Sequence, residues 1–134
     1  MAHKIYLAIS ALIWLGYGLY CFFAPGSLDE AAGIVARTTT GATEVRAMYG
    51  GLQASIGVLC LLALWQPGQI RIALSCVGWL TAGLALGRFA GLFLDDSGTS
   101  YTYGALGFEI VCAVGAFALL ARLPAGLSGE IDAS

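Results

Sequence analysis

Four ionisable side chains interrupt the long apolar runs of this sequence: Glu44, Arg46, Arg88 and Glu109. A charge placed in hydrocarbon costs about 2.5–3.5 kcal/mol on insertion scales, so such residues are rare there and usually pair or mark a functional site. Arginine and glutamate can bridge one another, bind a charged group or take part in ion movement. The positions of these residues therefore decide which chemistry is available.

The depth of each charge follows from helix rise, about 1.5 Å per residue. Arg46 is expected about 5 Å inside one end of the second apolar segment, Arg88 about 9 Å inside the third, and Glu109 about 9 Å inside the fourth. Because consecutive spans alternate in direction, all three fall in the same outer half of the membrane. We therefore predict one polar cluster in which Glu109 bridges one or both arginines.

The helical spacing adds two uncharged polar residues to this predicted cluster. Tyr49 and Gln53 follow Arg46 at the i, i+3, i+4 spacing that places residues on one helix face. If Glu44 stays near the interface and faces water, two arginines face one glutamate in the cluster. The resulting excess cation invites an anion such as a lipid phosphate, a carboxylate ligand or a partner's acid. The predicted ligand-binding residues are Arg46, Tyr49, Gln53, Arg88 and Glu109.

Two other interpretations of the charged residues stay open at this point. Arginines near the ends of spans extend their charged groups to the interface, and a buried bridge between arginine and glutamate can simply fix helix register. Catalysis or ion movement is the other alternative. The sequence does not choose among these roles.

Motifs of common enzymes are missing from the chain. There is no nucleophile elbow, paired-histidine zinc motif or phosphate loop, and no apolar segment contains a histidine. We predict no catalytic residue, metal site or cofactor, which favours a non-enzymatic protein. A net charge of −2 gives no indication of nucleic-acid binding. The cysteines lie singly in different apolar segments and are predicted to be small buried residues: Cys21, Cys60, Cys76 and Cys112.

The elements that position these residues are transmembrane helices. Of 134 residues, 59% are hydrophobic and 10% are charged, whereas soluble domains carry about 25% charged residues. A membrane-crossing helix needs about 20 apolar residues. We predict an all-α, four-transmembrane-helix bundle at residues 1–123, followed by a polar tail at 124–134. The predicted spans are 5–23, 45–65, 70–94 and 103–121.

Two finer features are also predicted. The run Ser27 to Glu30 has the form of a capping box, which predicts a short helix from 28 to 35 on the outer membrane surface. In the third span, small residues repeat every four positions, a pattern that permits close helix packing within the bundle or against a neighbouring subunit. These predicted helix-packing residues are Gly83, Gly87 and Gly91.

The chain carries three motifs that indicate a family: the run EVRAMYGGLQ at 44–53, Gly87-Arg88, and Tyr103-Gly104-Ala105 leading to Glu109. In these motifs the chain resembles an uncharacterised family of small bacterial membrane proteins with four predicted helices, a domain of unknown function. The resemblance covers nearly the whole chain up to Arg122, and it implies no established activity. More distantly, the layout is similar to the DoxX-like proteins, some of which are linked to redox or quinone-associated complexes.

These observations favour a bacterial inner-membrane protein that binds a membrane lipid, a small amphipathic ligand or a partner subunit through the cluster. One alternative is an accessory subunit of a membrane redox or transport complex, joined through the glycine face of the third span. Another is a small oligomeric transporter or channel. Lys4, Arg71 and Arg122 fall on one side, against Arg37 on the other, which predicts that both termini are cytoplasmic.

Overall fold

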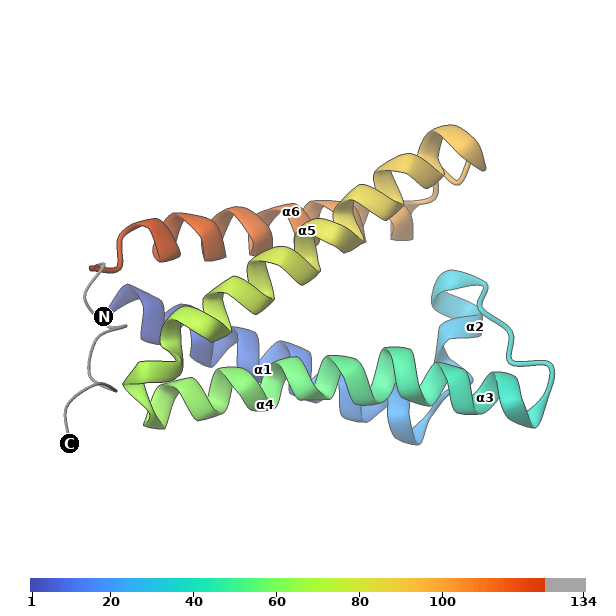
Figure 1. Ribbon diagram of the computed structural model, residues 1–134. Helices are drawn as coiled ribbons and strands as arrows, with labels where there is room; N and C mark the ends of the chain where they lie inside the picture. The colour runs from blue at the N-terminus through green and yellow to red at the C-terminus, as the bar shows by residue number, and fades with distance from the viewer. Residues whose placement is uncertain (125–134) are drawn as a thin grey trace.

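Four helices long and apolar enough to cross a membrane make up most of the structure, a computed structural model that describes residues 1–124 (Figure 1). No strand occurs in this described part of the chain, so the predicted all-α bundle of four transmembrane helices is confirmed. Beyond Pro124, the predicted polar tail lies outside the described residues. The four spanning segments are Ala2–Phe23, Thr39–Trp65, Pro67–Leu94 and Ser100–Ala121.

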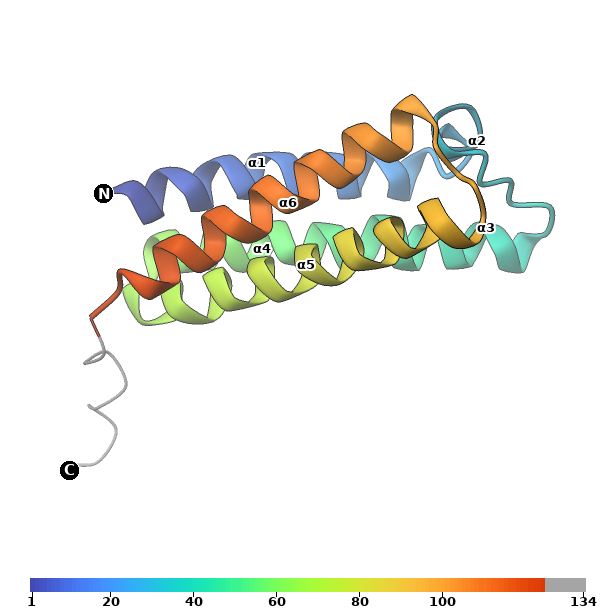
Figure 2. The same ribbon diagram turned by 90° about the horizontal axis from the view of Figure 1, so that it is seen from above.

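The helices form two packed pairs that meet at one end and diverge at the other. Helix α1 (Ala2–Phe23) packs along α4 (Leu52–Trp65), and α5 (Ile70–Leu94) packs along α6 (Ser100–Ala121). Helix α1 begins, and α6 ends, at the end where the pairs meet, which we call the terminal end. The opposite end, where the pairs lie apart, we call the open end (Figures 1 and 2).

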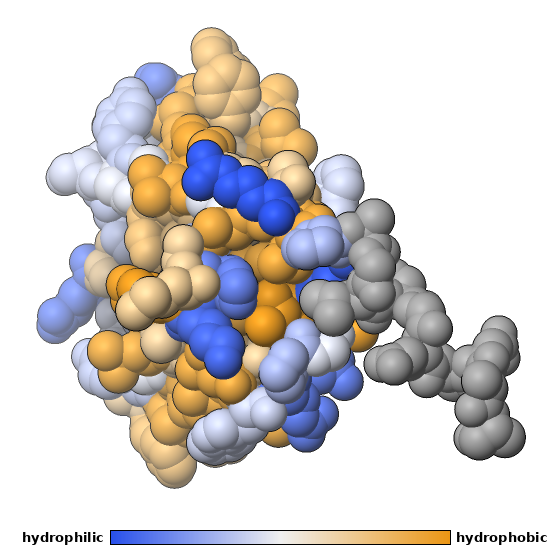
Figure 3. Space-filling view, turned by 90° about the vertical axis from the view of Figure 1, so that its left-hand side faces the viewer, coloured by the Kyte–Doolittle hydropathy of each residue, from blue (hydrophilic) through white to orange (hydrophobic). Residues whose placement is uncertain are grey.

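The main hydrophobic core lies where the two pairs converge. It draws buried residues from all four long helices, so it holds the pairs together near the terminal end: Leu7, Ala11, Trp14, Ile56, Cys60, Ala63, Ile70, Ala73, Leu74, Val77 and Ala116. Figure 3 views the molecule from this end, where hydrophilic side chains lie among hydrophobic ones. Three of the four cysteines are buried as predicted, and Cys76 is partly exposed.

The α1–α4 pair packs closely because glycines in it leave no room for a Cβ atom. A Cβ on Gly18 would lie 2.8 Å from the Cα of Ala54, and a Cβ on Gly57 would lie 2.8 Å from the Cα of Leu15. Such distances are below any ordinary carbon–carbon contact. The two backbones therefore approach as small residues allow in membranes.

The predicted glycine series on α5 does not serve this purpose within the chain. A Cβ added to Gly83 or Gly87 would meet no atom within 4 Å, and one on Gly91 would touch only the side chains of the following loop. Within the chain, the close glycine contacts thus lie on another pair of helices, because small-residue spacing alone does not identify the partner. Packing of this series against a neighbouring subunit stays a prediction.

The second spanning helix begins six residues earlier than predicted. Thr38 caps it by accepting a hydrogen bond of 3.0 Å from the backbone N–H of Gly41, and helix α3 (Thr39–Val45) follows. The residues at its start are polar, so the hydropathy pattern did not predict this turn as part of the span. A π-helical stretch, η1 (Arg46–Gly51), then leads into α4. Such a stretch widens the helix locally and is often found at functional sites.

The loop helix is shorter than predicted and is not closed by the predicted capping box. Helix α2 (Ser27–Ala32) begins at Ser27 itself, whose side chain caps nothing, and ends at Gly33 with φ +68°. The side chain of Leu28 is buried against Cys21 and Val45. Helix α2 is therefore anchored to the bundle by a buried leucine rather than only lying on a surface.

Arg71 closes the terminal end of the α5–α6 pair. Its Nη2 donates to the carbonyl oxygens of Leu123, at 3.4 Å, and Pro124, at 2.9 Å. The last carbonyls of a helix have no partner within the helix. The arginine therefore supplies hydrogen bonds to the chain just after α6 and places positive charge where the helix dipole favours it.

Candidate functional site

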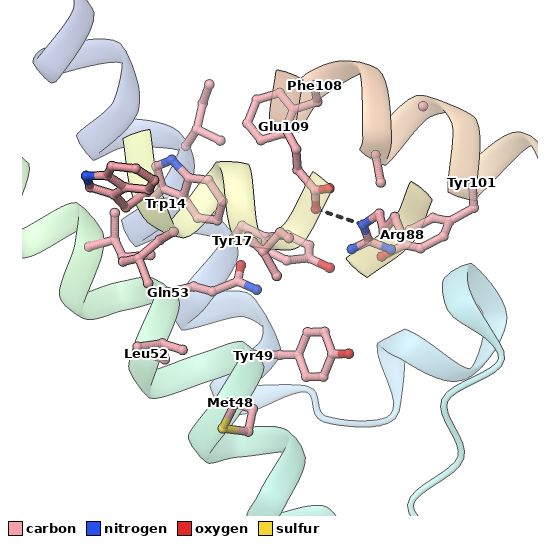
Figure 4. Close-up of a pocket in the computed structure, with 18 of the residues that line it drawn as sticks. Trp14, Tyr17, Met48, Tyr49, Leu52, Gln53, Arg88, Tyr101, Phe108 and Glu109 are labelled. Atoms are coloured by element: carbon pink, nitrogen blue, oxygen red, sulfur yellow. Dashed lines mark hydrogen bonds and ion pairs between the residues drawn. The ribbon is translucent and has the colours of Figure 1, made fainter. Parts of the chain in front are cut away.

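A pocket of about 840 Å³ occupies the space between the two helix pairs (Figure 4). Small-molecule pockets in proteins span about 300–1,000 Å³. Every one of the four spanning segments contributes to its walls. The lining residues are Ile13, Trp14, Tyr17, Met48, Tyr49, Leu52, Gln53, Ile56, Trp79, Leu80, Gly83, Leu84, Arg88, Ser100, Tyr101, Gly104, Ala105, Phe108 and Glu109.

Most of the pocket wall is apolar, including its rim. The side chains of Met48 and Leu52 on one helix pair, and of Leu80 and Leu84 on the other, line the pocket and are exposed. Exposed apolar side chains of this kind are suited to contact with lipid tails in a membrane-spanning bundle. The gap between the pairs is therefore bordered mainly by apolar groups.

The polar end of the pocket is an ion pair between the last two helices. The Nε of Arg88 on α5 donates to Oε1 of Glu109 on α6 across 2.7 Å. The Glu109 side chain is only 4% exposed, whereas that of Arg88 is 27% exposed. The Arg88 guanidinium also lies 5.5 Å from the centre of the Tyr101 ring, a distance at which a cation is attracted to an aromatic face. The predicted contact between Glu109 and an arginine is thus confirmed.

The ion pair leaves hydrogen-bonding capacity unused. Oε2 of Glu109 is buried and has no partner. A buried acceptor without a partner costs about 1–3 kcal/mol, and more when it is charged. Trp14, which also lines the pocket, likewise has a buried, unpartnered Nε1. Both atoms belong to side chains on the pocket wall, so a bound molecule that displaces their immediate neighbours could satisfy them.

Arg46 does not join this pair, contrary to the predicted cluster of three. Its side chain does not line the pocket, and its Nε donates instead to the carbonyl of Phe22, at 3.1 Å. That carbonyl lies in the last turn of α1, where backbone acceptors lack partners within the helix. The predicted excess cation is therefore absent from the pocket, which holds one arginine and one glutamate.

Tyr49 and Gln53, two of the residues predicted to bind a ligand, line the pocket. In Figure 4 they extend from the second span, and the hydroxyl end of Tyr49 points toward the side of the pocket that holds Arg88. Tyr49 belongs to the π-helical stretch η1. Tyr17 and Tyr101 also line the pocket but were not predicted from the sequence. Their only signal was a position among the aromatic residues near the span ends, which resembles an ordinary interfacial belt.

A second hollow, of about 580 Å³, lies next to the first at the open end. Its walls are more polar and include Asp29 and Glu30 of α2 and residues 97 and 99–102. Arg88, Tyr49 and Tyr101 border both spaces. The guanidinium therefore stands between an apolar pocket among the helices and a polar hollow beneath the loop helix.

The fold and the pocket define a multi-pass membrane protein built as a four-helix bundle. More particularly, the chain belongs to the family described as a domain of unknown function, DUF4345, whose model matches residues 2–120. This match confirms the resemblance to an uncharacterised family. No curated protein and no solved structure matches the chain, so the similarity to DoxX-like proteins gains no support.

Proposed function

We propose that this protein binds a lipid-like amphipathic molecule in the pocket between its helix pairs. The observation that carries the proposal is the combination of a mainly apolar pocket between the helix pairs with a buried carboxylate oxygen that has no partner. The apolar part of the molecule would lie along the aromatic and aliphatic walls. Its polar end would lie beside Arg88 and Glu109, with Tyr49 and Gln53 in support.

The proposal places the protein in the inner membrane of a bacterium with both termini in the cytoplasm. Lys4 and Arg71 lie near the terminal end, as does Arg122, whereas Asp29 and Glu30 belong to the loop at the open end. An excess of basic residues favours the cytoplasmic side. The ion pair would then lie toward the outer leaflet.

Blocking the pocket is expected to remove the bound molecule. Gly83 lines the pocket and has open space where a side chain would begin, so Gly83→Phe fills the pocket without meeting backbone. Native mass spectrometry of the wild-type protein, extracted in mild detergent, should show a retained lipid-sized mass. We expect Gly83→Phe to retain at least about fivefold less of it, because the ring replaces the ligand's apolar contacts.

The matched control is Gly87→Phe, one helical turn away on the same helix. Gly87 also has open space around it, but it does not line the pocket. This variant should retain the lipid-sized mass at the wild-type level. Equal retention in Gly83→Phe and Gly87→Phe would refute binding in the pocket.

The same spectra report subunit number, so a change of oligomer confined to Gly87→Phe would support the alternative that the glycine series packs against a neighbouring subunit.

A further inference from the structure

The charge balance of the pocket restricts which head group it can accept. Arg88 and Glu109 are the only lining residues with formal charges, and they neutralise one another through the 2.7 Å contact. The Glu109 carboxylate would repel an anionic head group, because the Arg88 charge that could attract it is already neutralised by Glu109. The Arg88 guanidinium would repel a cationic head group for the corresponding reason. Because the Glu109 side chain is only 4% exposed, water screens its charge weakly, so the pocket favours an uncharged head group.

The unused hydrogen-bonding atoms restrict the head group further. Oε2 of Glu109 can only accept, and it lacks a donor. Arg88 has five N–H donors, of which one is used by Glu109. A hydroxyl group both donates and accepts, so one hydroxyl can donate to Oε2 and accept from the guanidinium. An ether or a ketone can only accept and would leave the carboxylate oxygen without its partner.

From these two restrictions we infer that the ligand's head group is uncharged and carries a hydroxyl, as in a long-chain alcohol or a monoacylglycerol. The inference rests on the proposed function, because it assigns the chemistry of the molecule bound at that site. It replaces the anion that the sequence suggested, since Arg46 does not reach the pocket. The hydroxyls of Tyr17 and Tyr49 and the amide of Gln53 belong to the same wall and offer further hydrogen bonds to a head group with more than one hydroxyl.

Tryptophan fluorescence can measure this selectivity directly. Trp14 and Trp79 line the pocket, whereas Trp65 does not, so the variant Trp65→Phe removes the one tryptophan outside the pocket wall. Trp79 is largely exposed and also senses probe in the micelle, which makes a background measurement necessary. Four probes with one alkyl chain, brominated at the same mid-chain position, quench these rings when bound. The probes are the alcohol, its methyl ether, the carboxylate and the alkyl phosphate. Quenching that persists in a Gly83→Phe background measures partition into the micelle and is subtracted.

The alcohol is expected to bind at least about tenfold more tightly than the methyl ether, because the ether cannot donate to the charged acceptor. The carboxylate and the alkyl phosphate are expected to bind at least about tenfold more weakly than the alcohol. Glu109→Gln removes the negative charge and leaves Arg88 unpaired in the pocket. In this variant the preference should reverse, with the alkyl phosphate binding more tightly than the alcohol.

The outcomes separate the two proposals. If the methyl ether binds as tightly as the alcohol, or an anionic probe binds more tightly in the wild-type pocket, the head-group inference is overturned while lipid binding stands. If no probe quenches beyond the Gly83→Phe background, the proposed function itself falls. The comparison of four probes on the wild-type pocket decides the inference even if Glu109→Gln does not fold.

Discussion

The variant Glu109→Ala is expected to lose about 3–5 kcal/mol of stability, the largest effect of any single change that we predict. Removing one partner of a largely buried ion pair leaves the other charge uncompensated, here the Arg88 guanidinium between the apolar pocket and the polar hollow. Reversible unfolding in mixed micelles of mild detergent and dodecyl sulfate gives the free energy of unfolding. Glu44→Ala is the control: Glu44 is exposed and forms no salt bridge within residues 1–124, so its loss should change stability by less than about 0.5 kcal/mol.

A double variant distinguishes a structural ion pair from a ligand site. Arg88→Met with Glu109→Leu replaces both charges by apolar groups of similar size, a change that is often neutral or stabilising for buried pairs. We expect the free energy of unfolding to return to within about 1 kcal/mol of wild type, while the retained lipid-sized mass falls to the level of Gly83→Phe. A stable double variant that retains the ligand would show that the pair only joins the helices.

The second large effect is expected at the contact between α1 and α4. Gly57→Ala places a Cβ against the backbone of Leu15, where it would lie 2.8 Å from the Cα atom and overlap the backbone nitrogen. Backbone cannot move aside as a side chain does, so the helices must separate along their length. We expect a loss of about 2–3 kcal/mol, at the upper part of the range for overpacked cores, measured by the same unfolding titration.

Gly87→Ala supplies the matched control for the glycine contact. Its added methyl group would meet no atom within 4 Å, and alanine is favoured over glycine in a helix by about 1 kcal/mol. This variant should therefore be neutral or slightly more stable than wild type. Equal losses at Gly57 and Gly87 would contradict the structure, because they would show that both glycines lie in close helix contacts.

The class of fold and the spans were predictable because they depend on local composition. A chain with 59% hydrophobic residues and four apolar runs of membrane-crossing length has few ways to satisfy its backbone other than four helices. Helix α5, Ile70–Leu94, has the bounds predicted for the third span. The second begins earlier, at Thr39, because its first turn is polar and is fixed by a threonine cap rather than by hydropathy.

The contact between Arg88 and Glu109 was also predictable from the sequence. Helix rise and alternating direction place the two side chains at the same height, and a buried charge needs a partner. Arg46 was also predicted to join the cluster because it has a similar height, but it donates to the end of α1 instead. Height along a span is a one-dimensional quantity, whereas a contact also depends on how each helix is rotated.

The amino-acid sequence by itself thus determined that this is a four-helix membrane protein with charges paired inside it, since hydropathy and the cost of buried charge act along the chain. Only the tertiary structure decided that the helices form two pairs, and that glycines bring backbones together between α1 and α4 rather than at Gly83, Gly87 and Gly91. It also decided that the pocket between the pairs is electrically balanced. These features depend on how whole helix surfaces fit together, which no local pattern of residues specifies.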